Sequence, residues 1–424
     1  MRGSRLHSLL ALAATALLSY TQFAAATTSS NNANIPGTRI SARQATQQSC
    51  NGAPELCGRT YDAVTHMGAH NSAFVRDAST NNSIAGNQYF PATRALDDGL
   101  RLLQAQVHPL GDGIELCHSS CALLDAGPLG KWLAGIKTWL EGHPNEVVTL
   151  LLVNGDGKKM DAAAFGRVFE AAGLGKYGFV PTNTGAGGKD EWPTLRSMIA
   201  TNTRLVIFIT DIAASDRYPY LLPQFDHVFE TPWAVTSPTG FNCTLDRPRT
   251  ASWAASGPRA AIAAGKLSLM NHFRYNTVGG GSAGLGTIMF PASEDVAATN
   301  SPETTAEDAS SAGRGTLGAH AERCVGEWAG GKPTFVLVDF YSEGPALATA
   351  DRLNGVRTTS TSGGGGGGGS AAGDAGGSPS PSPSPSPSRP PVTGGGGGGS
   401  SGSSRDSGVA FGLVVFIVGA LVML

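Results

Sequence analysis

Short apolar runs alternate with amphipathic stretches between residues 50 and 357 of this 424-residue chain. The run Glu146–Val153 is almost continuously apolar, which is typical of a parallel strand buried on both faces, and Arg204–Thr210 repeats the pattern. Shorter runs predict six further strands: Tyr61–Val64, Leu100–Val107, Ile114–Cys117, His227–Glu230, Leu267–Met270 and Thr334–Phe340.

Helices are predicted between several of these strands. Apolar residues recur at helical spacing from Leu129 to Leu140, and this helix should end near Gly142. Further helices are predicted over Ala162–Ala172, Trp192–Ala200, Pro258–Ala264 and Thr316–Trp328. Eight strands with intervening helices predict an α/β fold, a distorted TIM (β/α)8 barrel. A doubly wound open sheet is the alternative, although no glycine-rich dinucleotide fingerprint follows the first strand.

Both ends of the chain have the composition of targeting and spacer segments. Arg2 and Arg5 precede an apolar run and small residues, so residues 1–26 are interpreted as a secretory signal peptide, with a membrane anchor as the alternative. Residues 27–49 are predicted to be a disordered lead-in, 50–357 the barrel, and 358–402 a Gly/Ser/Pro-rich stalk. Residues 403–424, a polar spacer and an apolar tail, are interpreted as a GPI-anchor signal rather than a tail-anchored helix. We therefore expect a secreted protein that is anchored at the cell surface, on the plasma membrane or cell wall.

Charge and cysteine content agree with an extracellular protein. The formal charge of −2 gives no reason to expect a nucleic-acid partner, and a monomer is predicted. Six cysteines in a secreted chain predict three disulfides: the local pairs Cys50–Cys57 and Cys117–Cys121, which leave Cys243 with Cys324. Zinc binding is the alternative, without any paired CxxC spacing to favour it. Sequons at Asn81 and Asn242 predict a glycoprotein.

Polar side chains gather where the predicted strands end, and in a parallel barrel functional residues lie at those ends. One such histidine alone is more commonly structural, but so many polar residues are hard to attribute to packing. His70 and His118 follow successive strands, and two imidazoles can serve as general base and general acid near neutral pH. The other polar residues at these ends are Asn71, Gln104, Gln106, His108, Asn154, Asp156, Thr210, Asp211, Asn271, His272, Asp339 and Tyr341.

Four motifs in order resemble the phosphatidylinositol-specific phospholipase C X-domain superfamily, especially its secreted fungal and bacterial branches. They are His70-Asn71-Ser72, Ala95-Leu96-Asp97-Asp98-Gly99-Leu100-Arg101, Leu116-Cys117-His118 and Asn145-Glu146-Val147-Val148, and the resemblance runs from about Tyr61 to Ser342. It implies a distorted TIM barrel that cleaves phosphodiesters. It also implies that His70 is the general base toward an attacking substrate hydroxyl, that His118 protonates the leaving alcohol, and that Asp339 orients His70.

The chain departs from this family where charge is expected. Metal-dependent relatives bind calcium through acids at the positions of Gln104 and Gln106, and bacterial relatives place an aspartate and an arginine there. A third acidic position is Asn154. Because calcium prefers carboxylate oxygens, we expect no cofactor, with weak calcium binding by these amides and Asn71 as the alternative. The same four amides and Arg274 are candidates for binding the headgroup, and Arg101, Lys158 and Arg274 are candidate cations for the phosphate.

The resulting functional hypothesis is an extracellular phosphoric diester hydrolase of the phospholipase C type in lipid metabolism. Its substrate would be a phosphoinositide or glycosyl-phosphoinositide lipid. The alternative is a weak or inactive barrel that binds a lipid headgroup or wall glycan, and a third interpretation is a structural surface glycoprotein. A glycerophosphodiester phosphodiesterase is the nearest enzymatic rival, but its His-Arg-Gly start and Glu-x-Asp pair are missing here.

Overall fold

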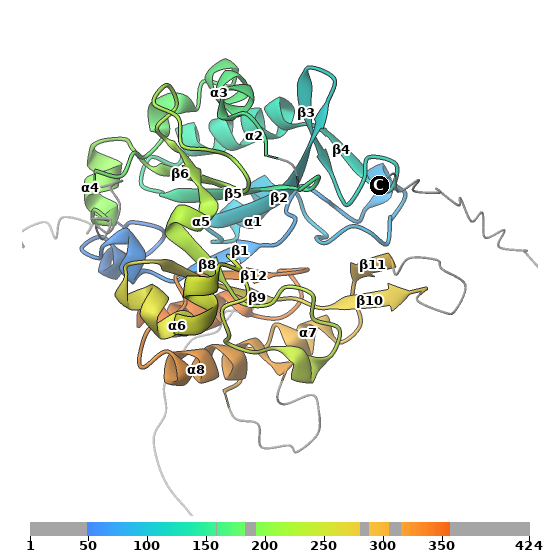
Figure 1. Ribbon diagram of the computed structural model, residues 1–424, viewed down its shortest axis with the longest axis vertical. Coiled ribbons are helices and arrows are strands. Elements are labelled where there is room, and N and C mark those ends of the chain that lie inside the picture. The colour runs from blue at the N-terminus through green and yellow to red at the C-terminus, as the bar shows by residue number, and fades with distance from the viewer. Residues whose placement is uncertain (1–48, 158, 183–191, 280–287, 305–314, 357–424) are drawn as a thin grey trace, which may run out of the picture. The chain divides into compact units, whose positions relative to one another are not determined.

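Eight parallel strands form the centre of the molecule, in the spatial order β7-β6-β5-β2-β1-β12-β9-β8 (Figure 1). The computed structural model describes residues 49–356 except 158, 183–191, 280–287 and 305–314. Among these residues no ladder joins β7 to β8, so the barrel has an open seam there. The parallel strands are β1 (His66–Ala69), β2 (Leu102–Leu110), β5 (Val148–Asn154), β6 (Leu205–Ile209), β7 (Leu221–Pro223), β8 (Val228–Glu230), β9 (Leu267–His272) and β12 (Phe335–Val338).

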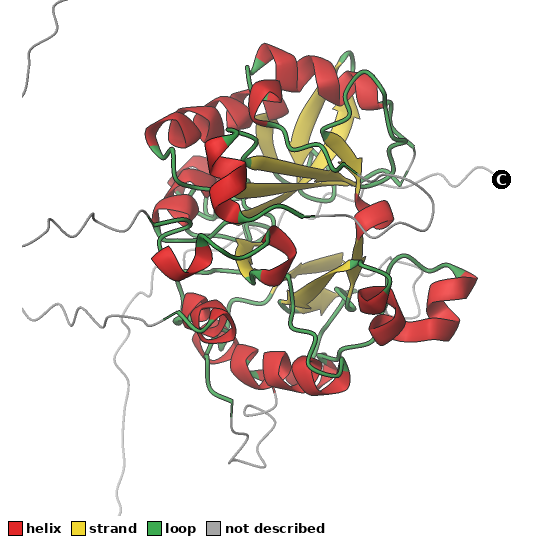
Figure 2. Ribbon diagram, turned by 90° about the vertical axis from the view of Figure 1, so that its left-hand side faces the viewer, coloured by secondary structure: helices red, strands yellow, loops and turns green. Residues whose placement is uncertain are grey.

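Helices lie outside the strands, as expected for a barrel of βα units (Figure 2). The predicted α/β class and distorted TIM-barrel architecture are confirmed. Three antiparallel pairings accompany the barrel in the described residues: β3 (Gly113–Cys117) pairs with β2 and with β4 (Asp125–Pro128), and β10 (Tyr275–Val278) pairs with β11 (Ile288–Pro291). The helices are α1 (Ala92–Asp97), α2 (Leu129–Gly142), α3 (Ala162–Ala171), α4 (Leu195–Ala200), α5 (Gln224–His227), α6 (Ala251–Ala263), α7 (Val296–Thr299), α8 (Leu317–Glu327) and α9 (Ala346–Asn354).

The strands are apolar along their whole length because both of their faces are buried. In β2, Leu103, Ala105 and Val107 belong to the outer cluster that contains the apolar faces of α2 and α3. Leu102 belongs instead to the inner cluster, together with Leu151 of β5 and other inward residues of the barrel. Successive side chains of a strand alternate between faces, so the residues that follow Leu102 on the inner face are Gln104, Gln106 and His108.

Two strand predictions are wrong. Tyr61–Ala63 is a short 3-10 helix rather than a strand, and β1 begins at His66. Tyr61 is fully buried, and its hydroxyl group lies 2.5 Å from the Thr149 hydroxyl inside the inner cluster. Periodicity alone cannot distinguish such a buried turn from a buried strand.

The segment Ile114–Cys117 is a strand, but it is not a barrel strand. β3 runs antiparallel to β2 as a hairpin, with His108 opposite Glu115 (Figure 1). The eighth parallel strand is β7, which is only three residues long and was not predicted from the pattern. His118 therefore enters the site from a hairpin beside the barrel, and not from the end of a barrel strand.

The three disulfides join the expected pairs, Cys50–Cys57, Cys117–Cys121 and Cys243–Cys324. Ligand atoms of Cys243, His320 and Cys324 lie within 4.8 Å of one another, but both cysteines are oxidised and offer no thiolate to zinc. Asn81 is exposed and Asn242 half-buried, and their glycosylation stays a prediction. The predicted signal peptide, nearly all of the lead-in, the stalk and the anchor signal lie outside the described residues. No helix in the described part is long and apolar enough to cross a membrane.

Candidate active site

The register of three neighbouring strands brings the principal candidate residues to one level of the barrel. Ala69 at the end of β1 pairs with Val338 of β12 on one side and with Leu103 of β2 on the other. The next residues along these strands are His70, Asp339 and Gln104. All three are buried, above the apolar inner cluster. The strand ladder therefore fixes their relative positions.

His70 and Asp339 form a hydrogen-bonded dyad, with Nδ1 of the imidazole 2.8 Å from Oδ1 of the carboxylate. Asn87 Nδ2 donates to the same Oδ1 at 2.9 Å, and the imidazole stacks on Phe273 with 3.6 Å between ring centres. When Nδ1–H donates to Asp339, Nε2 of His70 is a hydrogen-bond acceptor. It has no partner among the described residues. This is the arrangement of an oriented general base.

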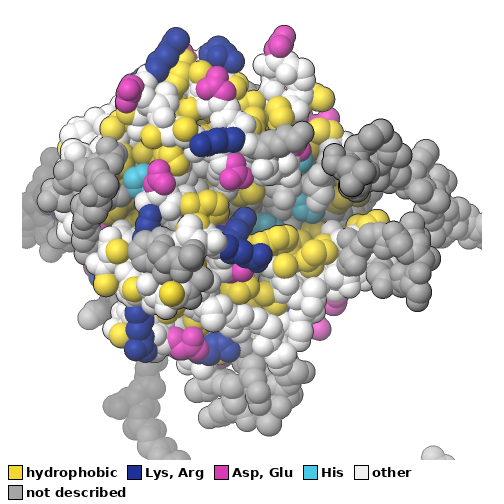
Figure 3. All heavy atoms as spheres, in the orientation of Figure 1, with side chains coloured by type: hydrophobic (Ala, Val, Ile, Leu, Met, Phe, Trp, Pro, Cys, Tyr) yellow, Lys and Arg dark blue, Asp and Glu magenta, His cyan; other side chains and the backbone are white. Residues whose placement is uncertain are grey.

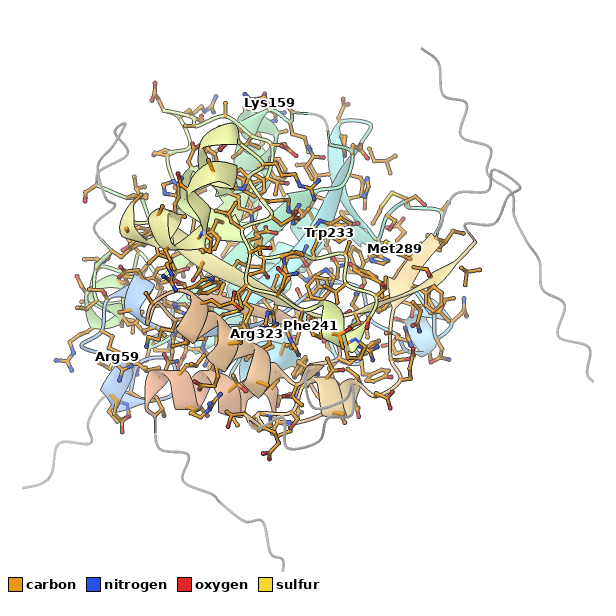
Figure 4. All side chains as sticks on the ribbon, turned by 60° about the horizontal axis from the view of Figure 1, so that its bottom comes forward. Arg59, Lys159, Trp233, Phe241, Met289 and Arg323 are labelled. Carbon is orange, nitrogen blue, oxygen red and sulfur yellow. A yellow bond between two sulfur atoms is a disulfide. The ribbon has the colours of Figure 1, made fainter. Side chains whose placement is uncertain are left out.

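Aromatic residues extend from the dyad along one side of the site. Tyr275 lies edge-on to Phe273 at 5.8 Å, and Trp233 lies edge-on to Tyr275 at 6.1 Å (Trp233 is labelled in Figure 4). Burial, assisted by the nearby Asp339 carboxylate, raises the pKa of Tyr275, so its phenol stays neutral. Figure 3 shows a few histidine side chains at the surface of the face that it draws, next to apolar ones.

His118 directly follows β3, in a loop that the Cys117–Cys121 disulfide closes. Its backbone N–H donates to the Leu124 carbonyl at 2.9 Å, and its ring packs against Phe74 with 5.3 Å between centres. Nδ1 is buried and has no hydrogen-bond partner in the described part of the chain. Burial first, and then the charges of His70 and His108, lower the pKa of His118 to about 3. The free protein therefore holds this imidazole neutral near pH 7.

The two glutamines hold the loops that carry the histidines. Gln104 Oε1 accepts the backbone N–H of Asn71 at 2.5 Å, and Gln106 Oε1 accepts the backbone N–H of Ser119 at 2.8 Å. Asn71 and Ser119 both have positive φ, 49° and 60°, which is uncommon for residues other than glycine. Each glutamine therefore supports one sharp turn beside a candidate catalytic histidine.

The other predicted binding residues have different environments. Asn71 is fully buried, yet both polar atoms of its side chain lack a partner among the described residues. Buried polar groups are nearly always hydrogen-bonded, so this amide is open to a bond from a ligand or a water. Asn154 Oδ1 accepts the backbone N–H of Asp156 at 3.1 Å. Arg274 lines, with Asp339, a cavity of about 10 Å³, which holds one water at most and no headgroup.

Arg101, another candidate cation, does not reach this layer. Arg101 precedes β2 and pairs with Glu146 at 2.7 Å, at the opposite end of the strand from His108. It is therefore wrong as a phosphate-binding candidate, and its ion pair ties β2 to the segment before β5. Lys158 lies outside the described residues.

Comparison with known proteins decides the family. The model of the family described as PI-PLC X 1, the phosphatidylinositol-specific phospholipase C X domain, matches residues 56–354. The chain belongs to this family. The predicted resemblance is thereby confirmed over most of the chain.

Relatives in the PI-PLC X family include two fungal proteins and a plant one. A PI-PLC X domain-containing protein of Arthroderma benhamiae is 38% identical over 309 residues, covering 72% of this chain and 90% of its own. An uncharacterized secreted protein of the same fungus is 33% identical and covers 78% and 69%. A PI-PLC X domain-containing protein of Arabidopsis thaliana is 29% identical over 34% of each chain. Among solved structures, the phosphatidylinositol-specific phospholipase C of Listeria monocytogenes aligns with a TM-score of 0.44 at 12% identity, covering 71% and 96%.

A calcium ion, which metal-dependent PI-PLC X proteins use, does not fit the oxygens found here. Of the four amides that stand at or near the metal positions, Gln104, Gln106 and Asn154 already accept backbone N–H groups. Only Asn71 keeps its side-chain oxygen without a partner within the described residues. A hard cation prefers six or more oxygen ligands, several of them charged. We therefore derive no catalytic step through a metal.

Three residues of this PI-PLC X site were missed in the sequence. Asn87 and Gln88 lie in the loop after β1, far from any strand end, where no local pattern marks them. Gln88 Nε2 donates to the His70 carbonyl at 2.7 Å, so it fixes the backbone of the base. Phe273 lies one residue beyond β9, and only the inner-face alternation of that strand would have indicated it.

Proposed function

We propose that this chain is an extracellular phosphoric diester hydrolase of the phospholipase C type, which cleaves a phosphoinositide-like lipid headgroup. The family supports phosphodiesterase chemistry, and the observation that carries the proposal is the buried His70–Asp339 dyad. His118 lies within electrostatic range of His70, because the His70 charge lowers the pKa of His118. A substrate phosphate placed between the two imidazoles would meet a base on one side and an acid on the other.

In the proposed step, Nε2 of His70 accepts the proton of a substrate hydroxyl group adjacent to the phosphate. The hydroxyl oxygen forms a bond to phosphorus, and the bond from phosphorus to the lipid alcohol oxygen breaks. That oxygen takes a proton from His118. The Asp339 carboxylate stabilises the imidazolium that forms on His70.

His118 must hold a proton to act as the acid, although its pKa in the free protein is about 3. A bound phosphodiester supplies the missing stabilisation, since an adjacent negative charge favours the protonated imidazole. Binding of the substrate thus favours the protonated form of His118. The unpartnered Asn71 amide is the proposed donor to a phosphate or headgroup oxygen, and Gln104 and Gln106 can add their amide N–H groups.

The proposed reaction needs no metal, because three of the four amide oxygens that would bind calcium already accept backbone N–H groups. Activity is therefore expected to survive EDTA. If EDTA abolishes activity and calcium restores it, the reaction is metal-dependent and the glutamines have a different role.

The direct test replaces His70, and separately His118, by alanine and measures hydrolysis of phosphatidylinositol and a glycosyl-phosphoinositide. Loss of turnover of at least about 10³-fold is expected for His70→Ala, since the base is removed from the attacking hydroxyl. Unchanged hydrolysis in either variant contradicts the proposal.

A second candidate function is headgroup binding without turnover. The unpartnered, fully buried Asn71 amide favours it, because that amide can bond a headgroup oxygen whether or not chemistry follows. Binding of inositol phosphate by wild-type protein that hydrolyses none of the diesters would support this alternative. Secretion belongs to both proposals and is supported by the secreted fungal relative. The GPI anchor at the cell surface is proposed from the sequence of residues 403–424.

A further inference from the structure

A second histidine–carboxylate pair lies on the inner face of β2. Nδ1 of His108 is 2.6 Å from Oδ1 of Asp156, which belongs to the turn after β5. The His108 side chain is 8% exposed and that of Asp156 is 39% exposed. The ring packs against Gly155, where an added Cβ would lie 2.4 Å from Nε2 and Cε1. Glycine at this position is therefore required for the ring to occupy its place.

The other nitrogen of each imidazole, His108 Nε2 and His118 Nδ1, is buried and lacks a hydrogen-bond partner in the described part of the chain. A proton on His108 lowers the pKa of His118, so only a neutral His108 ring can stabilise a protonated His118. The two rings are also joined through the backbone: Gln106, two residues before His108 on the same face, holds Ser119, which follows His118. Both nitrogens are open to a partner, since buried polar atoms rarely stay unpaired.

The protonation states of the two rings give His108 Nε2 and His118 Nδ1 complementary roles. With Nδ1–H donating to Asp156, neutral His108 presents a lone pair at Nε2. A protonated His118 carries N–H groups on both nitrogens, of which one faces the leaving alcohol and the other, Nδ1–H, needs an acceptor. His108 Nε2 is that acceptor, directly or through one water, and hydrogen bonds of this kind commonly tighten only in the substrate complex.

We infer that Asp156 and His108 form a relay behind His118, which orients the general acid and stabilises its protonated form. This inference rests on the proposed function and deepens it. His108 is thus a positioning residue that acts through His118. The relay supplies what the acid otherwise lacks, since His70 has a carboxylate partner and His118 has none among the described residues.

Other titratable groups near the relay come from the hairpin, from the turn after β5 and from the end of β1. Glu115 is the cross-strand partner of His108, and burial, with the Asp125 charge, raises the pKa of Glu115. Asp156 faces His108 from the β5 turn, and His70 faces His118 from β1. Negative charge on Asp156 or Glu115 favours the protonated acid, whereas a proton on His70 or on His108 opposes it.

The test compares two leaving groups on the same inositol phosphate: a lipid alcohol, which needs protonation, and p-nitrophenolate, which leaves without it. His108→Ala is expected to lower kcat at least about 30-fold on the lipid and less than about 3-fold on the p-nitrophenyl ester, as His118→Ala should. Asp156→Asn should lose activity to a smaller extent on the lipid alone and shift the alkaline limb of its pH profile to lower pH. His108→Gln, whose Oε1 can accept Nδ1–H, should recover part of the loss.

Exposed His143 at the end of α2 provides the matched control, and His143→Ala should leave both rates unchanged. Equal losses of His108→Ala on both substrates, or no loss on either, would overturn the relay. Thermal melting of each variant identifies misfolded protein. If His108→Ala is misfolded, the comparison of the two substrates is made with Asp156→Asn and His108→Gln instead.

A failure of the relay can be distinguished from a failure of the proposed function. If wild-type protein turns over neither ester, the proposed function fails, and the contact is tested by ¹⁵N NMR of the imidazoles with inositol phosphate bound. A change in the His118 Nδ1 signal in His108→Ala supports the contact, and an unchanged signal contradicts it.

Discussion

Replacing Asp339 by asparagine isolates the charge of the dyad from its shape. Oδ1 of Asp339 accepts from both His70 and Asn87, while Oδ2 has no partner among the described residues. An asparagine side chain is expected to keep its oxygen at the Oδ1 position, where two donors meet it, and to place its amide at the Oδ2 position. The hydrogen bond to Nδ1–H, and with it the tautomer of His70, should therefore survive.

What is lost is the attraction between carboxylate and imidazolium. These charges lie about 4 Å apart, which corresponds to about 4 kcal/mol at an effective dielectric constant near 20. Because the imidazolium forms only as the hydroxyl proton is transferred, this energy should appear almost entirely in kcat, as a loss of about 10³-fold.

The assay is steady-state hydrolysis of a short-chain phosphoinositide below its aggregation limit, with thermal melting of the same preparations. KM should change less than about 3-fold. The melting temperature should stay the same or rise, because the variant removes a buried charge. A loss in kcat below about 10-fold would refute the charge argument. A large loss together with a large fall in melting temperature would show that the residue is structural.

Three further predictions follow from other parts of the molecule. Burial lowers the pKa of His66 from 6.5 to about 4. The stability that the neutral, buried ring contributes is therefore complete above pH 6.5, and the free energy of unfolding declines by about 3 kcal/mol toward pH 4. His66→Phe should flatten this decline, which urea unfolding across that pH range measures. Gln106→Leu should lower kcat about 10-fold, because it releases the Ser119 turn beside His118. Asn202→Ala, at a remote turn, should leave kcat unchanged. Equal rates for wild type and both variants would contradict the supporting role of Gln106. Deleting residues 403–424 should move the protein from the cell surface to the medium, and retention at the surface in a fractionated culture would refute the anchor.

Much of the barrel could be predicted because its strands are buried on both faces and therefore leave a continuous apolar signal. β5 and β6 were found almost to the residue for this reason. β7 was missed because three residues between turns carry no period, and the Tyr61 turn was mistaken for a strand because a buried aromatic side chain is apolar in either conformation. The direction of β3 depends on pairing with β2, which no local pattern reports.

The site shows the same division between local and nonlocal information. His70 and Asp339 were identified as polar residues near the ends of predicted strands, and their roles came from the family resemblance. The parallel register then brings them together. The roles of Gln104 and Gln106 could not be predicted, since their partners are backbone N–H groups in loops distant along the chain. Asp156 and His108 were visible as polar strand ends, but only the structure pairs them.

The way Gln104 and Gln106 hold the two turns has a consequence for the conditions under which the site stays assembled. Neither an amide oxygen nor a backbone N–H titrates between mild acid and mild alkali, and neither is removed by a chelator. The two turns should thus be indifferent to the acidity and mineral content of the surrounding medium. Any response of turnover to acidity would then report the imidazoles and the carboxylates beside them, and not the loss of these turns.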